Sequence, residues 1–340
     1  MPRRPTIYDV AERAGVSKSL VSLVLRDSPK VSPARRAAVE RAIAELGYRP
    51  SRLAASLAAR RSRSIGVIID DFENPWFVDL LAGMRRALAD HGYHVSVADA
   101  ALNAHLGLSA LEGFVSLDVD GVVIASEQSL DGAIRVPHVV AGNRTDPPAG
   151  ADIVADDDTL GAAMAVEHLA GLGHRTIGHL AADSGPGALR REAFLDACRA
   201  RGLQGVLTAQ AHPTSERAGR TAADQLLDRR PELTAVFAAN DVMALGALSA
   251  ARERGLRVPQ DLSVIGYDDV PLAGSAYIDL STVDNMSAEV GEAAAAALLD
   301  RIDGAGPSEP VRRLIPPRLV ARGTTGPAPG SRPGNRSPDS

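Results

Sequence analysis

From Ile65 onward, short apolar runs rich in Val, Ile and Ala alternate with segments of helical periodicity. Strands that alternate with helices form parallel βαβ units covered on both faces. About 260 residues are too many for one open sheet, so we expect an α/β body of two doubly wound sub-domains. The expected strands lie at 65–70, 95–99, 120–126, 136–142, 151–157, 176–182, 206–211, 235–241 and 263–269. The expected helices include 162–172 and 189–200.

Charge divides the chain into a basic N-terminal part and an acidic remainder. Residues 1–63 hold 14 Lys and Arg against 5 Asp and Glu, whereas the remainder holds 23 against 37. Both lysines of the chain, Lys18 and Lys30, lie in the basic part. Such a segment can neutralise phosphates, while DNA would repel the acidic body. No apolar run of signal-peptide length follows the first arginines, so we expect a protein that is not exported.

The basic part begins with two short helical segments on either side of Gly15. Thr6 and Asp9 have the spacing of a capping box, which predicts a helix that starts near Ile7 and stops at Gly15. Ser17 caps a second helix, whose apolar arc holds Leu20, Val21 and Val24. Its opposite arc mixes hydroxyls, cations and a leucine that we expect to be exposed: Lys18, Ser19, Ser22, Leu23 and Arg26.

A third helix is predicted from Ser32-Pro33 to a stop at Gly47, with Ala37, Ala38, Ile43 and Leu46 on its apolar side. The hairpin alone fits either an ordinary helical hairpin or a helix-turn-helix, which places its second helix in the DNA major groove. Three short helices in a basic segment favour the helix-turn-helix. Serines can then pair with several bases, lysine with guanine, and a leucine with a thymine methyl.

The segment that follows, Arg49 to Ser64, is helix-prone but short. An isolated helix of fewer than about 12 residues is marginal in water. The segment fits a plain linker, or a hinge that folds on DNA and inserts Leu57 into a minor-groove step.

Long stretches of the chain resemble the lactose/galactose repressor (LacI/GalR) family. The N-terminal region matches without gaps over about sixty residues, through TIYDVAERAGVSKSLVSLVLR and VSPARRAAVERAIAELGYRPSRLAASLA. The resemblance continues through NPWF, EHLAGLGHRTIGHL, AVFAANDVMALGAL, RVPQDLSVIGYDD and PRLVARGTT. It implies a periplasmic-binding-protein-like body in which the chain crosses between sub-domains near residues 160, 286 and 316.

This resemblance implies a helix-turn-helix DNA-binding domain at 1–49, a hinge helix and linker at 50–63, and an effector-binding and dimerisation body at 64–325. The body would comprise an N-sub-domain (64–160 and 287–316) and a C-sub-domain (161–285 and 317–325). The tail, 326–340, is rich in Pro, Gly and Ser, so we expect it to be disordered. It has no heptads that would form a tetramer, which favours a homodimer.

The expected partner of the head is a near-palindromic, double-stranded operator. Its contacts are expected around the second helix, in the flanking turns and in the hinge. They are Thr6, Tyr8, Ser17, Lys18, Ser19, Ser22, Leu23, Arg26, Lys30, Ser32, Arg52, Leu53, Ala54 and Leu57.

Open α/β sheets bind ligands outside the carboxyl ends of their strands. The resemblance places Arg190, Asn240 and Asp268 against an effector, and a guanidinium, an amide and a carboxylate suit vicinal hydroxyls of a sugar. Of the two rings of Trp76 and Phe77, one can fill the core while the other offers its apolar face to a sugar. The full expected set is Asp70, Trp76, Phe77, Asn143, Arg190, Asn240, Asp268 and Asn285, and Gly142-Asn143-Arg144 departs from the family's usual residues.

Enzyme motifs are absent from the sequence. Gly185-Pro186-Gly187 has Arg190 where a dinucleotide fingerprint needs a third glycine, and there is no P-loop, HExxH or GxSxG. Cys198 is the sole cysteine, which suits a reducing compartment, and His168 and His174 are interpreted as structural. We therefore expect no catalytic residue, no metal and no cofactor.

Together these features predict a cytoplasmic, nucleoid-associated transcriptional regulator with no membrane partner, most simply a repressor of carbohydrate-utilisation genes that responds to a sugar. Two alternatives remain open: a transport-type sugar-binding protein without DNA function, and a regulator that responds to a nucleobase or nucleoside.

Overall fold

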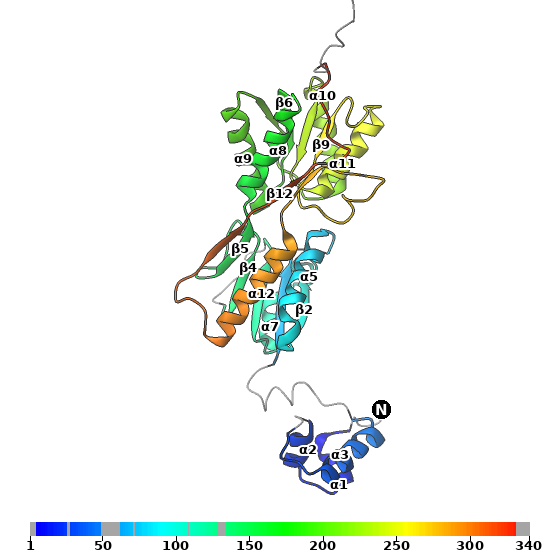
Figure 1. Ribbon diagram of the computed structural model, residues 1–340, viewed down its shortest axis with the longest axis vertical. Coiled ribbons are helices and arrows are strands. Elements are labelled where there is room, and N and C mark those ends of the chain that lie inside the picture. The colour runs from blue at the N-terminus through cyan, green and yellow to red at the C-terminus, as the bar shows by residue number, and fades with distance from the viewer. Residues whose placement is uncertain are drawn as a thin grey trace, which may run out of the picture. The chain divides into compact units, whose positions relative to one another are not determined.

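The computed structural model describes residues 5–25, 28–48, 62–70, 72–107, 109–127 and 134–330. The chain forms two compact units, Met1–Arg63 and Ser64–Ser340. Figure 1 shows the elements of both units.

The first unit is a bundle of three helices: α1 (Ile7–Ala14), α2 (Lys18–Leu25) and α3 (Pro33–Leu46). The expected capping box is present, because Thr6 and Asp9 exchange hydrogen bonds at the start of α1. Gly15 and Gly47 end α1 and α3 with φ of 65° and 61°, a left-handed conformation that glycine adopts without a Cβ clash.

The core of this unit is built from small β-branched side chains. Val10, Val21 and Val39 are fully buried, with Ala42 beside them. The predicted apolar side of α3 is therefore partly wrong: Val39 and Ala42 are the buried residues, whereas Ala37 is exposed. Alanines recur so densely in α3 that their spacing alone does not identify the buried side.

The second unit contains two parallel sheets and a short antiparallel pair (Figure 1). The first sheet has six strands in the order β11-β5-β4-β3-β1-β2. They are β1 (Ser64–Ile69), β2 (His94–Asp99), β3 (Gly121–Ala125), β4 (His138–Ala141), β5 (Asp152–Asp156) and β11 (Arg312–Ile315). The second sheet has four, in the order β7-β6-β8-β9. They are β6 (Thr176–Leu180), β7 (Gln204–Leu207), β8 (Ala235–Ala238) and β9 (Ser263–Ile265). The antiparallel pair is β10 (Thr282–Asp284) and β12 (Arg318–Val320).

Helices cover the sheets of this unit on both faces. The first sheet buries one face beneath α5 (Trp76–Leu88) and α12 (Ser287–Asp303), and the other beneath α6 (Ala100–His105) and α7 (Ala110–Ser116). The second sheet packs against α8 (Asp158–Gly171) and α9 (Gly185–Ala200), and against α10 (Glu216–Arg229) and α11 (Asp241–Glu253). A 3-10 turn, Ala89–His91, follows α5. No described helix has the length and apolar character needed to cross a membrane.

We call the part built on the first sheet the N-sub-domain and the part built on the second sheet the C-sub-domain. The chain passes between them at 156–158, between β5 and α8, and again at 284–287, between β10 and α12. The third passage is at 315–318, between β11 and β12. The sequence places these passages near 160, 286 and 316.

Several element bounds differ from the sequence-based expectations. Helices α8 and α9 begin four residues early, at 158 and 185 rather than 162 and 189, because Asp157 and Ser184 cap their first turns. Strand β7 begins at 204 rather than 206. Helix α12 was not predicted, because the run SAEVGEAAAAALLD is alanine-rich and buries a broad side instead of a narrow stripe.

The start of the predicted disordered tail is packed against the body. The Ala328 amide donates to the Leu172 carbonyl, and Gly326 exchanges hydrogen bonds with Ser263. His174 contacts Ser263 and the Gly326 carbonyl, which is the structural role expected of it. The prediction of disorder is therefore wrong for residues 326–330, and the rest of the tail lies outside the described residues.

The crossing of α5 and α12 generates a stability prediction. A methyl group at Gly291 would overlap the Leu80 carbonyl of α5. The overlap can be relieved only if the backbone of α5 or of α12 shifts. We expect Gly291→Ala to lower the free energy of unfolding by about 1–3 kcal/mol, measured by urea denaturation. Gly113→Ala in α7 is the matched control, since nothing lies within 4 Å of its Cβ position. The control should gain up to about 1 kcal/mol, and an equal loss in both variants would contradict the close-approach argument.

Candidate DNA-binding surface and effector cavity

Polar side chains gather at the start of α2 in the first unit. Tyr8 is 63% exposed, and the Lys18 ammonium donates to its hydroxyl at 3.2 Å. The same ammonium lies 4.8 Å from the centre of the Tyr8 ring. Ser17 and Ser19 are exposed beside them, and Lys30 and Ser32 are exposed near the start of α3. This surface has the cations and hydroxyls that bind phosphates and base edges.

Two expected DNA contacts have other roles in the structure. The Thr6 hydroxyl donates to the Asp9 carboxylate at 2.7 Å, so it is used to cap α1. Leu23 is partly buried against the core of the unit, whereas Leu25 is 37% exposed. The prediction that Leu23 is the exposed leucine of α2 is therefore wrong. Leu23 lies on the flank of the helix, and packing within the bundle decides which flank is covered.

The remaining DNA-binding predictions divide in two. Ser22 is half-buried on α2. Arg26, Arg52, Leu53, Ala54 and Leu57 lie outside the described residues.

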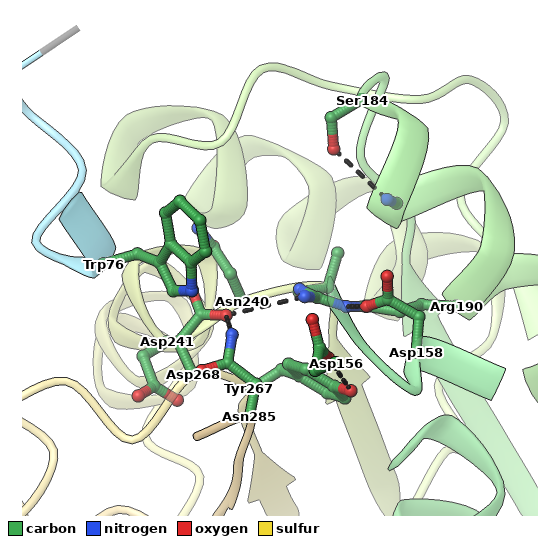
Figure 2. Close-up of polar contacts among 12 residues, drawn as sticks. Trp76, Asp156, Asp158, Ser184, Arg190, Asn240, Asp241, Tyr267, Asp268 and Asn285 are labelled. Carbon is green, nitrogen blue, oxygen red and sulfur yellow. Dashed lines mark hydrogen bonds and ion pairs between the residues drawn. The ribbon is translucent and has the colours of Figure 1, made fainter. Parts of the chain in front are cut away.

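In the second unit, the eight predicted effector residues line one cavity of about 580 Å³, its opening included. Asp70, Trp76, Phe77 and Asn143 come from the N-sub-domain, and Arg190, Asn240 and Asp268 from the C-sub-domain. Asn285 lies on the passage between β10 and α12. Figure 2 shows Trp76 facing Arg190, Asp268 and Asn285 across this cavity. The carboxyl ends of both sheets thus meet at one site, as expected for open α/β sheets.

Arg190 lies at the centre of the buried polar network. Its Nε donates to Asp158 at 2.6 Å and its Nη1 to the Ala239 carbonyl at 2.6 Å. Its Nη2 lies 3.6 Å from Asp268, and the guanidinium stacks 3.6 Å from the centre of the Tyr267 ring (Figure 2). Burial lowers the pKa of Arg190, but Asp158 and Asp268 outweigh burial and raise it above its usual value. The guanidinium is therefore charged and held in one orientation.

A second set of contacts supports Asp158 and joins the two sub-domains. The Asn143 amide donates to the other Asp158 oxygen at 2.8 Å, and Arg312 on β11 donates to the Asn143 oxygen. Tyr267 donates to Asp156 at 2.7 Å. Asn143 therefore orients Asp158, and through it Arg190, from the N-sub-domain.

Asp268 and Asn285 form the next part of the cavity wall. The Asn285 amide donates to Asp268 Oδ1 at 2.9 Å, so this oxygen lies between Asn285 and Arg190 (Figure 2). Asp268 has φ of 113°, a strained conformation for a residue other than glycine. Burial, followed by the nearby Asp241 and Asp158 carboxylates, raises the pKa of Asp268 well above its usual value despite Arg190. Asn240 caps α11, since its side-chain oxygen accepts from the Met243 amide.

The aromatic pair and Asp70 line the N-sub-domain side. Trp76 and Phe77 meet edge to face at 5.1 Å, and both are largely buried at the start of α5. The Arg144 guanidinium lies 5.7 Å from the Trp76 ring. Asp70 accepts from Ser126 and from the Glu127 amide, and burial raises its pKa.

Sequence reasoning missed Glu127, which joins the two sub-domains at the edge of the cavity. One Glu127 oxygen accepts from Thr145, by both its amide and its hydroxyl, and the other accepts from the Gly185 amide at 3.1 Å. Arg144 lies 3.5 Å from the same carboxylate. Gly185 opens α9, where amides have no acceptor within the helix and a carboxylate is favourable. We call this set of contacts the Glu127 bridge.

Other missed residues had weak signals in the sequence. Asp158 and Tyr267 adjoin strand-end motifs, and Arg144 follows the unusual Gly142-Asn143 pair. None of these patterns indicates which neighbours the side chains meet.

Comparison with known proteins identifies both units. Residues 6–51 match the profile of bacterial regulatory proteins of the lacI family, and residues 166–325 match a periplasmic binding protein-like domain. The transcriptional regulator CelR of Thermobifida fusca is 35% identical, over 94% of this chain and 98% of its own. The chain belongs to the lacI family. The transcriptional repressor CytR of Escherichia coli is 34% identical, over 94% of this chain and 96% of its own.

Solved structures agree with this assignment. The lac repressor dimer bound to operator and the anti-inducer ONPF superposes with a TM-score of 0.81 at 30% identity. That alignment covers 95% of this chain and all of the other. A CelR–cellobiose complex superposes with a TM-score of 0.66 at 32% identity, over 94% of this chain and all of the other. The lacI-family chain is therefore a ligand-responsive, DNA-binding transcriptional regulator and not an enzyme.

The Glu127 bridge generates a prediction about local stability. Glu127→Gln leaves one acceptor oxygen where the carboxylate has two, so the Gly185 amide or Thr145 loses its partner. We expect hydrogen exchange at the Gly185 amide to accelerate about tenfold or more, because hydrogen bonds to charged groups contribute about 1.5–3 kcal/mol. Glu112→Gln on the exposed side of α7 is the control and should change nothing at Gly185. Unchanged exchange in Glu127→Gln would show that the bridge does not hold α9.

Proposed function

We propose that this regulator is a repressor whose affinity for its operator is controlled by a sugar or sugar-like effector in the cavity at Arg190. The observation that supports this most strongly is the single cavity lined by all eight predicted effector residues. Its guanidinium, amide and carboxylate groups suit vicinal hydroxyls, and the Trp76 ring offers an apolar face. The relatives named as a repressor and as a cellobiose complex support the same proposal.

The proposed coupling runs between the sub-domains. Side chains from both contribute to the cavity, so a ligand that contacts Trp76 and Arg190 together favours one arrangement of the sub-domains over another. Coupling free energies of this kind are typically about 1–3 kcal/mol.

We place the action of the protein in the cytoplasm, on nucleoid DNA, because its target is an operator. A nucleoside or nucleobase effector is the second candidate, since an amide and a carboxylate also bind base edges. A transport-type binding protein is excluded by membership of a regulator family.

Arg190 provides the test of the proposed function. Operator fragments are first selected with the full chain from random duplexes, and their affinity is measured with and without cellobiose, ribose, cytidine and hypoxanthine. Trp76, the only tryptophan, reports occupancy by its fluorescence. We expect a sugar to change operator affinity in the unmodified protein by about 5- to 150-fold and Arg190→Ala to lose that response while it still binds DNA. Arg199→Ala, whose side chain is 75% exposed on the same helix, should respond normally. A fully responsive Arg190→Ala would place the effector elsewhere.

We also propose that the functional form is a homodimer. An exposed apolar groove on the C-sub-domain is lined by Leu245, Leu248, Leu272, Tyr277 and Ile278. Tyr277 is 91% exposed and Leu272 is 50% exposed, which is unusual for large apolar side chains that have no partner. A second copy of the chain would cover them, as two subunits would be needed to read a near-palindromic operator.

A charge placed in this groove tests the dimer. We expect Leu272→Asp/Tyr277→Asp to shift the protein from dimer to monomer in light scattering, because two carboxylates would be buried without partners. Val115→Asp, on an exposed position of α7, should remain dimeric. A double variant that stays dimeric would rule out this groove as the interface.

A further inference from the structure

The effector cavity contains more acidic than basic groups. Three carboxylates line it, those of Asp70, Asp156 and Asp268, against the guanidinium groups of Arg144 and Arg190. Asp158 lies directly behind Arg190 and holds its Nε at 2.6 Å. With Asp158, four acidic side chains lie at or directly behind the cavity, against two guanidinium groups.

The two arginines are also already paired. Arg190 contacts Asp158 and lies 3.6 Å from Asp268. Arg144 lies 3.5 Å from Glu127, and its charge also acts on Asp70. A phosphate or carboxylate on a ligand would have to compete with these four acidic groups for the same two cations. Displacing an acidic group from its arginine costs free energy, and this cost is larger where burial weakens screening by water.

Two buried atoms of cavity residues have no hydrogen-bond partner among the residues that the structure describes. The first is Asn285 Oδ1, on a residue that is 1% exposed and whose amide nitrogen already donates to Asp268. This oxygen requires a donor. The second is Arg144 Nε, which requires an acceptor. Buried polar atoms without partners are rare, and a hydroxyl group can serve as either partner.

Burial and the surrounding charges also affect the protonation of the cavity. Burial, followed by the Asp158 carboxylate, raises the pKa of Asp156 well above its usual value despite Arg190 and Tyr267. Burial likewise raises the pKa of Asp268 well above its usual value. Both pKa values are raised chiefly because burial disfavours the charged form, and the same environment would disfavour a negative charge on a ligand.

We propose that the effector of this regulator is an uncharged, hydroxyl-bearing molecule, and that the cavity excludes phosphorylated and carboxylate-bearing compounds. The inference rests on the proposed function, since it concerns the same cavity. Under this proposal, free sugars and nucleosides fit the cavity, whereas sugar phosphates, uronates and nucleotides do not. The groups that impose the exclusion are Asp70, Asp156 and Asp268, and the groups left for the ligand's hydroxyls include Asn285 Oδ1 and Arg144 Nε.

Inorganic phosphate tests the exclusion without knowledge of the effector. Full-length protein is titrated with sodium phosphate against sodium chloride of equal ionic strength, with Trp76 fluorescence and melting temperature as readouts. We expect no phosphate-specific change in the unmodified protein. Asp156→Asn/Asp268→Asn removes two carboxylates at constant volume, and we expect it to bind phosphate at least tenfold more tightly. Asp70→Asn, at a less buried position, provides the same test with less risk to folding and should shift in the same direction.

Asp90→Asn/Asp118→Asn is the matched control, because it removes two exposed carboxylates outside the cavity and should behave as the unmodified protein does. Phosphate binding by the unmodified protein, reported by Trp76, would overturn the proposal. Equal phosphate affinity in the cavity variants and the control would overturn it as well, since the cavity carboxylates would then not be what excludes anions.

Matched ligand pairs distinguish this proposal from the proposed function. Ribose and ribose 5-phosphate, glucose and glucuronate, and cytidine and cytidine monophosphate are compared by Trp76 fluorescence. A pair in which the neutral member binds at least 100-fold more tightly supports both proposals, and its identity separates a sugar from a nucleoside. Tight binding of an anionic member would overturn the exclusion while leaving a small-molecule effector in place. If no member binds, the proposed choice of effector fails, and the phosphate experiment still decides the exclusion.

Discussion

The proposed effector cavity depends on the buried ion pair between Arg190 and Asp158. The 2.6 Å contact fixes the guanidinium so that it also reaches the Ala239 carbonyl, the Tyr267 ring and Asp268. Three segments of the C-sub-domain, at 158, 239 and 267–268, thereby contact the one cation that α9 carries. Burying both charges has a large desolvation cost, and removing either partner would leave the other uncompensated, at about 3–5 kcal/mol. The pair is therefore better explained by the geometry that it imposes on the cavity than by a gain in stability.

Much of this site was predictable from the sequence, because the carboxyl ends of parallel strands meet at one edge. Asp70, Asn240 and Asp268 each follow an apolar run, which places each of them at the carboxyl edge of its own sheet. That the edges of the two sheets meet at one cavity was implied by the resemblance to the LacI/GalR family. Glu127 and Arg144 were not predictable in this way. Glu127 follows β3, but its partner Gly185 belongs to the other sub-domain, and no local pattern encodes that pairing.

The errors in the predicted fold have a similar origin. Helix α12 lacks a narrow apolar stripe, because α5 and the first sheet cover it on more than one side. Leu23 lies on a flank of α2, where helical spacing leaves both flanks equivalent until the other helices choose one. In both cases the neighbours that determine burial come from elsewhere in the chain, and the pattern of the single segment does not identify them.

Several contacts join the sub-domains beside the cavity, among them the hydrogen bond from Tyr267 to Asp156. Asn143 reaches Asp158 on one side, and Glu127 reaches the start of α9 on another. A ligand can shift the equilibrium between arrangements of the sub-domains only by the difference between its affinities for them. Arg144 and Glu127 both belong to the N-sub-domain, so their ion pair positions Glu127 and does not itself join the sub-domains. A ligand that drew Arg144 away would act on the contact with Gly185 only through Glu127.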